Sequence, residues 1–147
     1  MTNAGDSVLE FGSPTTEGRD NAGYGGLFWR GPRSFSGGEV SLPGGTGRDD
    51  PMGSRSPWIA FTGRHDETSR RSTITFAEDP GNLGAPNQWF TRTESFGCVG
   101  SAPFFSEVVP LAPGESLRYR YGVSIADGDP AATEGDALLE ELASWRR

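Results

Sequence analysis

The apolar residues of this chain fall in short runs, which glycine, proline and small polar residues separate from one another. Such runs are typical of an all-β sandwich or barrel, because each strand crosses the fold once and then reverses in a turn. We therefore predict an all-β, antiparallel β-sandwich with strands near 7–11, 25–30, 57–63, 72–78, 88–96, 107–111 and 116–126. The glycine-rich stretch 36–56 is expected to be a loop with at most a short strand at 39–42.

The stretch SLRYRYGVSI has the clearest strand pattern. Every second position carries a large apolar side chain, namely Leu117, Tyr119, Tyr121, Val123 and Ile125. This period of two predicts that one face of the strand lies on a core and the other faces solvent. The turn dipeptide Pro113-Gly114 precedes the stretch. We therefore expect 107–111 and 116–126 to be two antiparallel strands joined by a short loop.

Helical periodicity occurs only near the C-terminus. Leu138, Leu142 and Trp145 form one apolar stripe there. The acidic residues Glu134 and Asp136 lie near the start of this segment, and two arginines, 146 and 147, end it, as the helix dipole favours. The chain is thus expected to comprise a partial β-sandwich domain over 1–128, followed by a linker and a short α-helix over 129–147.

Charge and length exclude several classes of function. The 147 residues suffice for one domain with a real core. All 13 basic residues are arginines, so no Schiff-base lysine and no P-loop lysine exists in this sequence. The 20 acidic residues give a net charge of −7 and leave no basic stripe to follow a phosphate backbone. We therefore expect no nucleic-acid partner.

The location of the protein is predicted from what the sequence lacks. Cys98 is the only cysteine, so no intrachain disulfide can form and nothing points to an oxidising compartment. The opening MTNAGDSVLEFG has neither the basic start nor the apolar run of a signal peptide, and no stretch approaches the length of a membrane span. These features predict a cytoplasmic protein without a membrane partner.

His65 is the only histidine and lies in the polar segment FTGRHDE. One interpretation is a general acid or base, held in one tautomer by a neighbouring carboxylate such as Asp66. The alternative is a surface histidine in a charged turn. A single histidine and a single cysteine are too few ligands for a copper, zinc or di-iron site. We therefore predict no metal and no cofactor.

Aromatic residues and arginines recur together near the predicted strand starts. The candidates for ligand binding are Tyr24, Trp29, Arg30, Trp58 and Arg64. Flat aromatic faces stack on the C–H faces of a sugar, while guanidinium groups hold its hydroxyls or carboxylate. The same residues would also suit a sandwich core with a cation–π rim. Both interpretations remain open at this point.

The stretch GYGGLFWRGPRSF contains three of these candidates. In a strand, Leu27 and Trp29 share one face, whereas Tyr24, Phe28 and Arg30 share the other. Both faces carry large side chains, so neither is expected to be freely solvated. We assign Leu27 and Trp29 to the core, and the opposite face to a ligand or to a missing half of the fold.

Four segments carry a resemblance to a known family: GRDNAGYGGLFWRGPRSF, MGSRSPWIAFTGRHD, STITFAEDPGN and the long run from QWFTRTESFG to YGVSIADG. In order and spacing they resemble the C-terminal half of a group of soluble bacterial proteins catalogued as the methane oxygenase PmoA family. The resemblance covers about 7 to 128 and implies that the N-terminal half of that family is missing here. It further implies half of a β-sandwich of the galactose-mutarotase type, in bacteria that process carbohydrates.

Three functions follow from the residues and the resemblance. The first is a β-sandwich that binds a sugar or sugar acid, or acts on it as an epimerase, mutarotase or lyase would, with His65 as acid or base and Asp66 or Glu94 as its partner. The second is a non-catalytic interaction domain, whose exposed sheet edge pairs with another copy or another chain. The third is the oxidoreductase that the family label states. Methane oxidation is disfavoured, because the chain has no membrane span and lacks copper-binding histidines.

Overall fold

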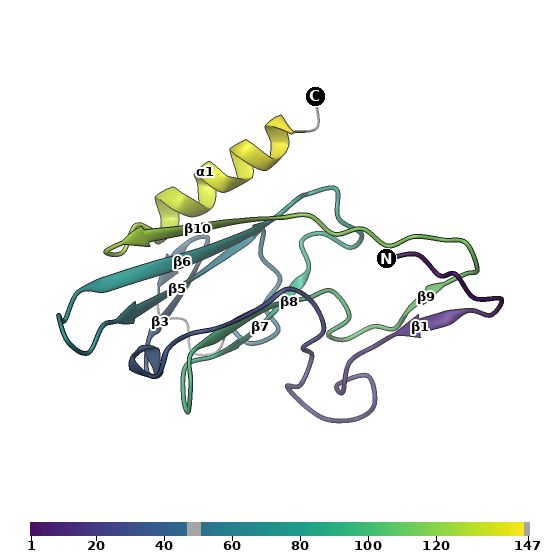
Figure 1. Ribbon diagram of the computed structural model, residues 1–147, viewed down its shortest axis with the longest axis horizontal. Helices are drawn as coiled ribbons and strands as arrows, with labels where there is room; N and C mark the ends of the chain where they lie inside the picture. Colours follow the sequence, from purple (N-terminus) through teal and green to yellow (C-terminus); the bar gives the residue numbers. More distant parts are fainter. Residues whose placement is uncertain (47–50, 146–147) are drawn as a thin grey trace.

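Two antiparallel sheets face each other in the computed structural model, and one helix covers the outer side of the larger sheet (Figure 1). The structure describes residues 1–46 and 51–145. The larger sheet has the strand order β10-β6-β5-β3-β4 and the smaller one β2-β8-β7, while β1 and β9 form a separate pair. This arrangement confirms the predicted antiparallel β-sandwich with a short C-terminal helix.

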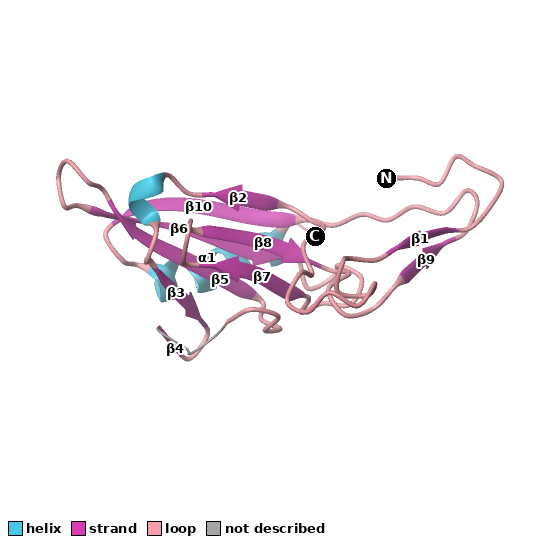
Figure 2. Ribbon diagram, turned by 90° about the horizontal axis from the view of Figure 1, so that it is seen from below, coloured by secondary structure: helices cyan, strands magenta, loops and turns pink. Residues whose placement is uncertain are grey.

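The elements follow the chain in a simple order. The five-stranded sheet contains β3 (Glu39–Leu42), β4 (Gly45–Thr46), β5 (Trp58–Arg64), β6 (Arg71–Glu78) and β10 (Tyr121–Asp127). The three-stranded sheet contains β2 (Phe28–Arg30), β7 (Gln88–Arg92) and β8 (Cys98–Ala102). The remaining elements are β1 (Leu9–Phe11), the short 3-10 helix η1 (Arg33–Phe35), β9 (Val109–Leu111) and α1 (Ala131–Ser144). Figure 2 shows the β1–β9 pair extending away from the two sheets.

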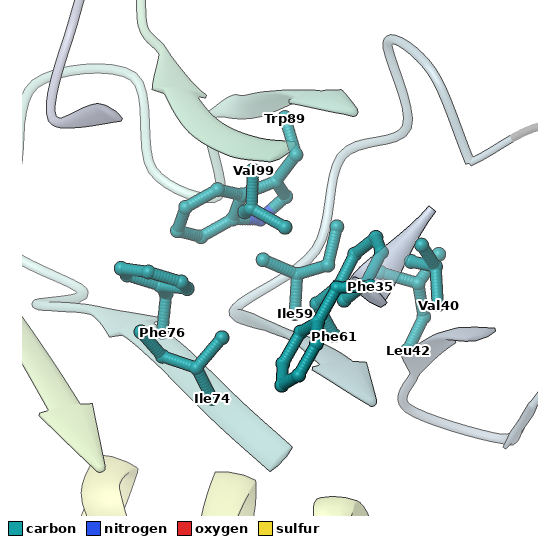
Figure 3. Close-up of a cluster of buried hydrophobic side chains, with 9 residues drawn as sticks. All are labelled: Phe35, Val40, Leu42, Ile59, Phe61, Ile74, Phe76, Trp89 and Val99. Atoms are coloured by element: carbon teal, nitrogen blue, oxygen red, sulfur yellow. The ribbon is translucent and has the colours of Figure 1, made fainter. Parts of the chain in front are cut away.

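The main core lies between the two sheets (Figure 3). Alternate residues of β5 and β6 point into it, because successive side chains of a strand face opposite sides. The buried side chains are Phe35, Val40, Leu42, Ile59, Phe61, Ile74, Phe76, Trp89 and Val99. The Trp89 indole N–H donates a hydrogen bond to the Ser56 carbonyl oxygen at 2.8 Å, so this ring is buried with its polar atom satisfied.

The opposite face of the five-stranded sheet carries α1. Trp58 and Ala60 from β5 pack there with Leu138 and Leu142 of the helix. Gly135 lets the helix lie against the indole of Trp58, because a Cβ at this position would overlap the ring. The Trp58 indole N–H also donates a hydrogen bond to Asp136 Oδ1 at 3.2 Å. Both faces of this sheet are therefore covered, one by α1 and the other by the smaller sheet.

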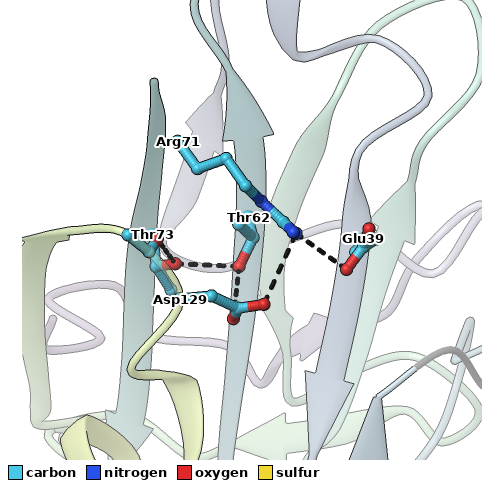
Figure 4. A network of polar contacts seen from close by, with 6 residues as sticks. Glu39, Thr62, Arg71, Thr73 and Asp129 are labelled. Atoms are coloured by element: carbon cyan, nitrogen blue, oxygen red, sulfur yellow. Dashed lines mark hydrogen bonds and ion pairs between the residues drawn. The ribbon is translucent and has the colours of Figure 1, made fainter. Parts of the chain in front are cut away.

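A polar network fixes the chain just before α1 (Figure 4). Asp129 accepts a hydrogen bond from the Thr62 hydroxyl at 3.1 Å and forms an ion pair with Arg71 at 3.4 Å. Arg71 also pairs with Glu39 at 2.8 Å. The Thr73 hydroxyl donates to the carbonyl oxygen of Gly128 at 2.8 Å. These contacts hold residues 128 and 129 on the sheet and so place the start of the helix over its outer face.

Three expectations about secondary structure were wrong. The segments 107–111 and 116–126 do not pair with each other, because β9 pairs with β1 and β10 with β6. The strand β8 was missed, since its residues CVGSA are too small to give a periodic signal. Trp145 does not continue the buried stripe of the helix, because it is 56% exposed. The expected arginines at the end of the helix lie outside the described residues.

Only some of the alternating apolar side chains in SLRYRYGVSI are buried. Leu117 is buried, but Val123 and Ile125 are 46% and 76% exposed. Val123 lies opposite Phe76 and Ile125 opposite Ile74, so both belong to the inner face of the five-stranded sheet. They stay exposed because β10 is the edge strand of that sheet.

Within the described ranges, no helix is long and apolar enough to span a membrane.

Candidate functional site

The outer face of the three-stranded sheet carries an open pocket walled by aromatic rings. In the sheet register, Phe28 and Phe90 flank Gly100 in one row, while Arg30 and Arg92 flank Cys98 in the next. The pocket has a volume of about 440 Å³ and is lined by Tyr24, Gly25, Gly26, Phe28, Phe90, Arg92 and Phe96. We call it the outer-face pocket.

Packing within the sheet fixes the aromatic walls of the outer-face pocket. The Tyr24 ring meets the Phe90 ring edge to face, with the centroids 5.4 Å apart. Phe90 is buried, whereas Tyr24 and Phe28 are 42% and 50% exposed. A Cβ at Gly100 would lie 3.0 Å from the Phe28 ring, so the glycine lets this ring lie close to the sheet. The pocket thus offers two accessible aromatic faces, Phe28 from β2 and Tyr24 from the segment before it.

Two guanidinium groups border these rings. Arg30 lies over the Phe96 ring at 4.2 Å from its centroid, and Arg92 lies over Phe90 at 5.5 Å. Neither arginine forms an ion pair with a carboxylate in the parts of the chain that the structure describes. In a chain with a net charge of −7, this is a local positive patch beside apolar surface. Such a patch favours an anionic group on a ligand.

Cys98 lies between the two arginines in the sheet register and is fully buried. Burial raises the pKa of its thiol, and the nearby charges of Arg92 and Arg30 oppose this effect only in part. The thiol is therefore protonated at neutral pH and behaves as a small apolar group.

The five residues predicted to bind a ligand separate into four places. Tyr24 lines the outer-face pocket and Arg30 borders it. Trp29 points to the inner side of the same strand, with its ring 5.4 Å from that of Phe61. Trp58 is 2% exposed beneath α1, and so its face is not open to a ligand.

Arg64 belongs to a second, polar groove on the other sheet. This groove has a volume of about 340 Å³ and is lined by Ser34, Ser36, Gly37, Gly38, Glu39, Thr62, Arg64, Asp66 and Arg71. We call it the polar groove. Opposite charges from Glu39 and Arg71 already pair within it at 2.8 Å, so part of its charge is satisfied by the protein itself.

The three residues predicted to be catalytic do not meet in either cavity. Asp66 is exposed and lines the polar groove. His65 is half-buried, with Nε2 at 2.8 Å from the Ser72 hydroxyl and its ring edge to face with Phe35. Glu94 is exposed in the turn between β7 and β8 and lines neither the outer-face pocket nor the polar groove. The structure therefore brings Asp66 together with Arg64 and leaves Glu94 apart.

A buried acid that the sequence analysis missed lies at the end of β6. Glu78 is 1% exposed, and its carboxylate accepts hydrogen bonds from the main-chain N–H and the side-chain amide of Asn87. Burial raises the pKa of Glu78, and these hydrogen bonds lower it by a smaller amount. Nearby, the Tyr121 hydroxyl lies 2.6 Å from the hydroxyl of Ser101, and burial raises the pKa of Tyr121 to about 12. An acidic residue directly after the strand-forming segment STITFA was the available signal.

Comparison with known proteins identifies one family. The model of a family of unknown function, DUF6807, matches residues 1–140. No curated protein and no solved structure matches this chain. In the described ranges, no three histidine, cysteine, aspartate or glutamate side chains are grouped as metal ligands would be.

Proposed function

We propose that this protein binds a sugar acid in the outer-face pocket. The chain belongs to the family of unknown function DUF6807. The observation that carries the proposal is the pair of arginines, Arg30 and Arg92, which lack a carboxylate partner among the described residues and lie beside exposed aromatic faces. A sugar acid combines a flat C–H face with a carboxylate, and so matches both features. The resemblance to the methane oxygenase PmoA family remains a prediction.

Each part of the pocket has a role in this proposal. The exposed rings of Tyr24 and Phe28 receive the apolar face of the sugar ring. Arg92 lines the same pocket and donates hydrogen bonds to the carboxylate. The volume of about 440 Å³ lies in the range of small-molecule sites and is large enough for one or two sugar rings.

The proposed activity is binding without chemistry. The described residues that line the pocket include no histidine and no carboxylate that could move a proton. His65 and Asp66 belong to a turn of the other sheet, and Glu94 does not line the outer-face pocket. The three predicted catalytic residues therefore have no part in this function.

A calorimetric titration with D-galacturonate tests the proposal. We expect saturable binding to the unmodified protein and a loss of affinity of about tenfold in Phe28→Ala, because half of the stacking surface is removed. Leu83→Ala is the matched control, since Leu83 is an equally exposed apolar residue, at 55%, outside the pocket. Equal affinity in the unmodified protein and Phe28→Ala would show that the ligand does not lie on this face. Absence of binding to galacturonate, glucuronate and their dimers would overturn the proposal.

A further inference from the structure

The edge strand β10 differs from the other sheet edges of the molecule. An unpaired strand edge invites pairing with another chain, and proteins protect such edges by making them short or by placing charges and proline there. In the described ranges the other edge strands have two to five residues: β4, β2 and β7 of the two sheets, and β1 and β9 of the separate pair. β10 has seven residues, and the only charged one is Asp127 at its end.

The inner face of β10 is also apolar and open. Val123 and Ile125 lie on the same face as the core residues Phe76 and Ile74 but are 46% and 76% exposed. The outer face of the strand is covered, because Gly122 packs on Leu138 of α1 and the Ser124 hydroxyl bonds to Glu134. An occupant of this edge would therefore extend the sheet and cover the two exposed apolar side chains at once.

We propose that a second copy of this chain pairs with β10, strand against strand and antiparallel, with the two-fold axis at Ser124. In this register Val123 of each copy lies opposite Ile125 of the other, and both pairs are on the inner face. A contact of this kind is isologous, because the same residues of both copies form it. The inference is independent of sugar-acid binding, since β10 contributes nothing to the outer-face pocket.

The charges at the two ends of β10 favour a second copy of this chain over an unrelated strand, and antiparallel over parallel pairing. Arg118 precedes the strand and Asp127 ends it, whereas Arg120 and Asp129 already pair with Asp79 and Arg71 of the same chain. Antiparallel pairing brings the basic end of one copy beside the acidic end of the other. Arg118 is exposed and has no ion pair with a described residue.

Asp127 can take part in such a contact. Its present ion pair with Arg70 joins two side chains that are 80% and 70% exposed, and pairs so exposed contribute little. Parallel pairing of two copies would instead bring like charges together. The charge pattern thus selects the same orientation as the apolar pairs.

Cysteine crosslinking tests both the dimer and its register. In the proposed register, two Ser124→Cys chains place their cysteines directly opposite each other, at a Cα separation that a disulfide can span. We expect a disulfide-linked dimer of Ser124→Cys under mild oxidation. The native Cys98 is fully buried and serves as the internal control, because the unmodified protein should give no crosslink.

A mixing experiment gives the second readout. Val123→Cys and Ile125→Cys should each remain uncrosslinked alone and form a heterodimer when mixed, because each lies opposite the other residue. Crosslinking of Val123→Cys alone, or failure of Ser124→Cys to crosslink, would overturn the proposed register.

Sedimentation equilibrium measures the association without any crosslink. Pairing over seven residues buries an area at the low end for specific interfaces, so we expect a dissociation constant on the order of micromolar. Ile125→Lys should weaken the dimer about tenfold or more, whereas Leu83→Lys, at an exposed site in the loop between β6 and β7, should leave it unchanged. A protein that stays monomeric to millimolar concentration would overturn the proposal.

Discussion

The two faces of strand β2 carry the same kind of side chain for different purposes. Trp29 points inward, where its ring packs against Phe35 and Phe61. Its neighbour Phe28 points outward and is half exposed beside the arginines of the outer-face pocket. The difference teaches that aromatic content does not identify a binding face. We propose that exposed rings, together with nearby charges that have no ion pair among the described residues, are the better indicator of such a face.

The reason for this difference lies in how the layers are stacked. The five-stranded sheet is covered on one side by α1 and on the other by the smaller sheet. The three-stranded sheet has a second sheet on its inner side only (Figure 1). The loop residues Met52 and Phe105 cover part of its outer face beside Phe90 and Cys98, and the outer-face pocket lies open beside them.

Replacement of the two neighbours on β2 should give the largest contrast. Trp29→Ala should lower the free energy of unfolding by about 3 kcal/mol, because it leaves a cavity between the sheets. Phe28→Ala should change it by no more than about 0.5 kcal/mol, as is usual for an exposed site. Urea denaturation of both variants measures the contrast. Equal losses of stability would contradict a packed Trp29 on the inner face and an exposed Phe28 on the outer face.

A smaller effect is expected at the helix that covers the other sheet. Gly135→Ala should lower the free energy of unfolding by about 2 kcal/mol, because the added Cβ overlaps the Trp58 ring. Helix propensity alone predicts the opposite sign, a gain of about 1 kcal/mol. Thermal unfolding therefore decides by sign whether α1 is packed as closely on the sheet as described. Galacturonate binding should not change in this variant, since Trp58 and α1 lie away from the outer-face pocket.

The buried acid Glu78 is expected to make the free energy of unfolding depend on pH. Glu78 has a raised pKa in the folded protein, so the folded state holds its proton at pH values where the unfolded state has lost it. The stability that it contributes is fully present below the ordinary glutamate pKa of 4.5 and is lost as the pH rises through the folded pKa.

Glu78→Gln should remove this part of the pH dependence, because glutamine has no proton to lose. Chemical denaturation of both proteins at a series of pH values from 4 to 8 measures the slopes. Glu140→Gln is a control, since Glu140 is an exposed carboxylate of α1 that forms no ion pair with a described residue. An unchanged slope in Glu78→Gln would contradict a raised pKa for this buried acid.

Much of the fold follows from local patterns, whereas the partners of each strand do not. The period of two in FWR assigned Trp29 and Phe28 to opposite faces, and the apolar stripe of Leu138 and Leu142 located the helix. The pairing of β9 with β1 depends on contacts about 100 residues apart in the chain. No signal within SEVVPLAPGESLRYRYG distinguishes that pairing from a local hairpin.

The candidate pocket could be predicted only in part for the same reason. Tyr24 and Arg30 belong to one segment and were identified from it. Phe90, Phe96 and Arg92 come from another hairpin, and only the register of β2, β8 and β7 brings them beside Phe28. Trp58 was misleading, because a tryptophan at a strand start looks alike whether a ligand or a helix covers it.

The central claim is that the arginine beside the exposed rings recognises a carboxylate. D-galacturonate and D-galactose share the same ring and differ at the carboxylate, so the ratio of their affinities isolates this contact. We predict that the unmodified protein prefers galacturonate by about tenfold or more, and that Arg92→Gln binds both sugars nearly equally. A preference that is absent in the unmodified protein, or that survives unchanged in Arg92→Gln, would contradict the claim.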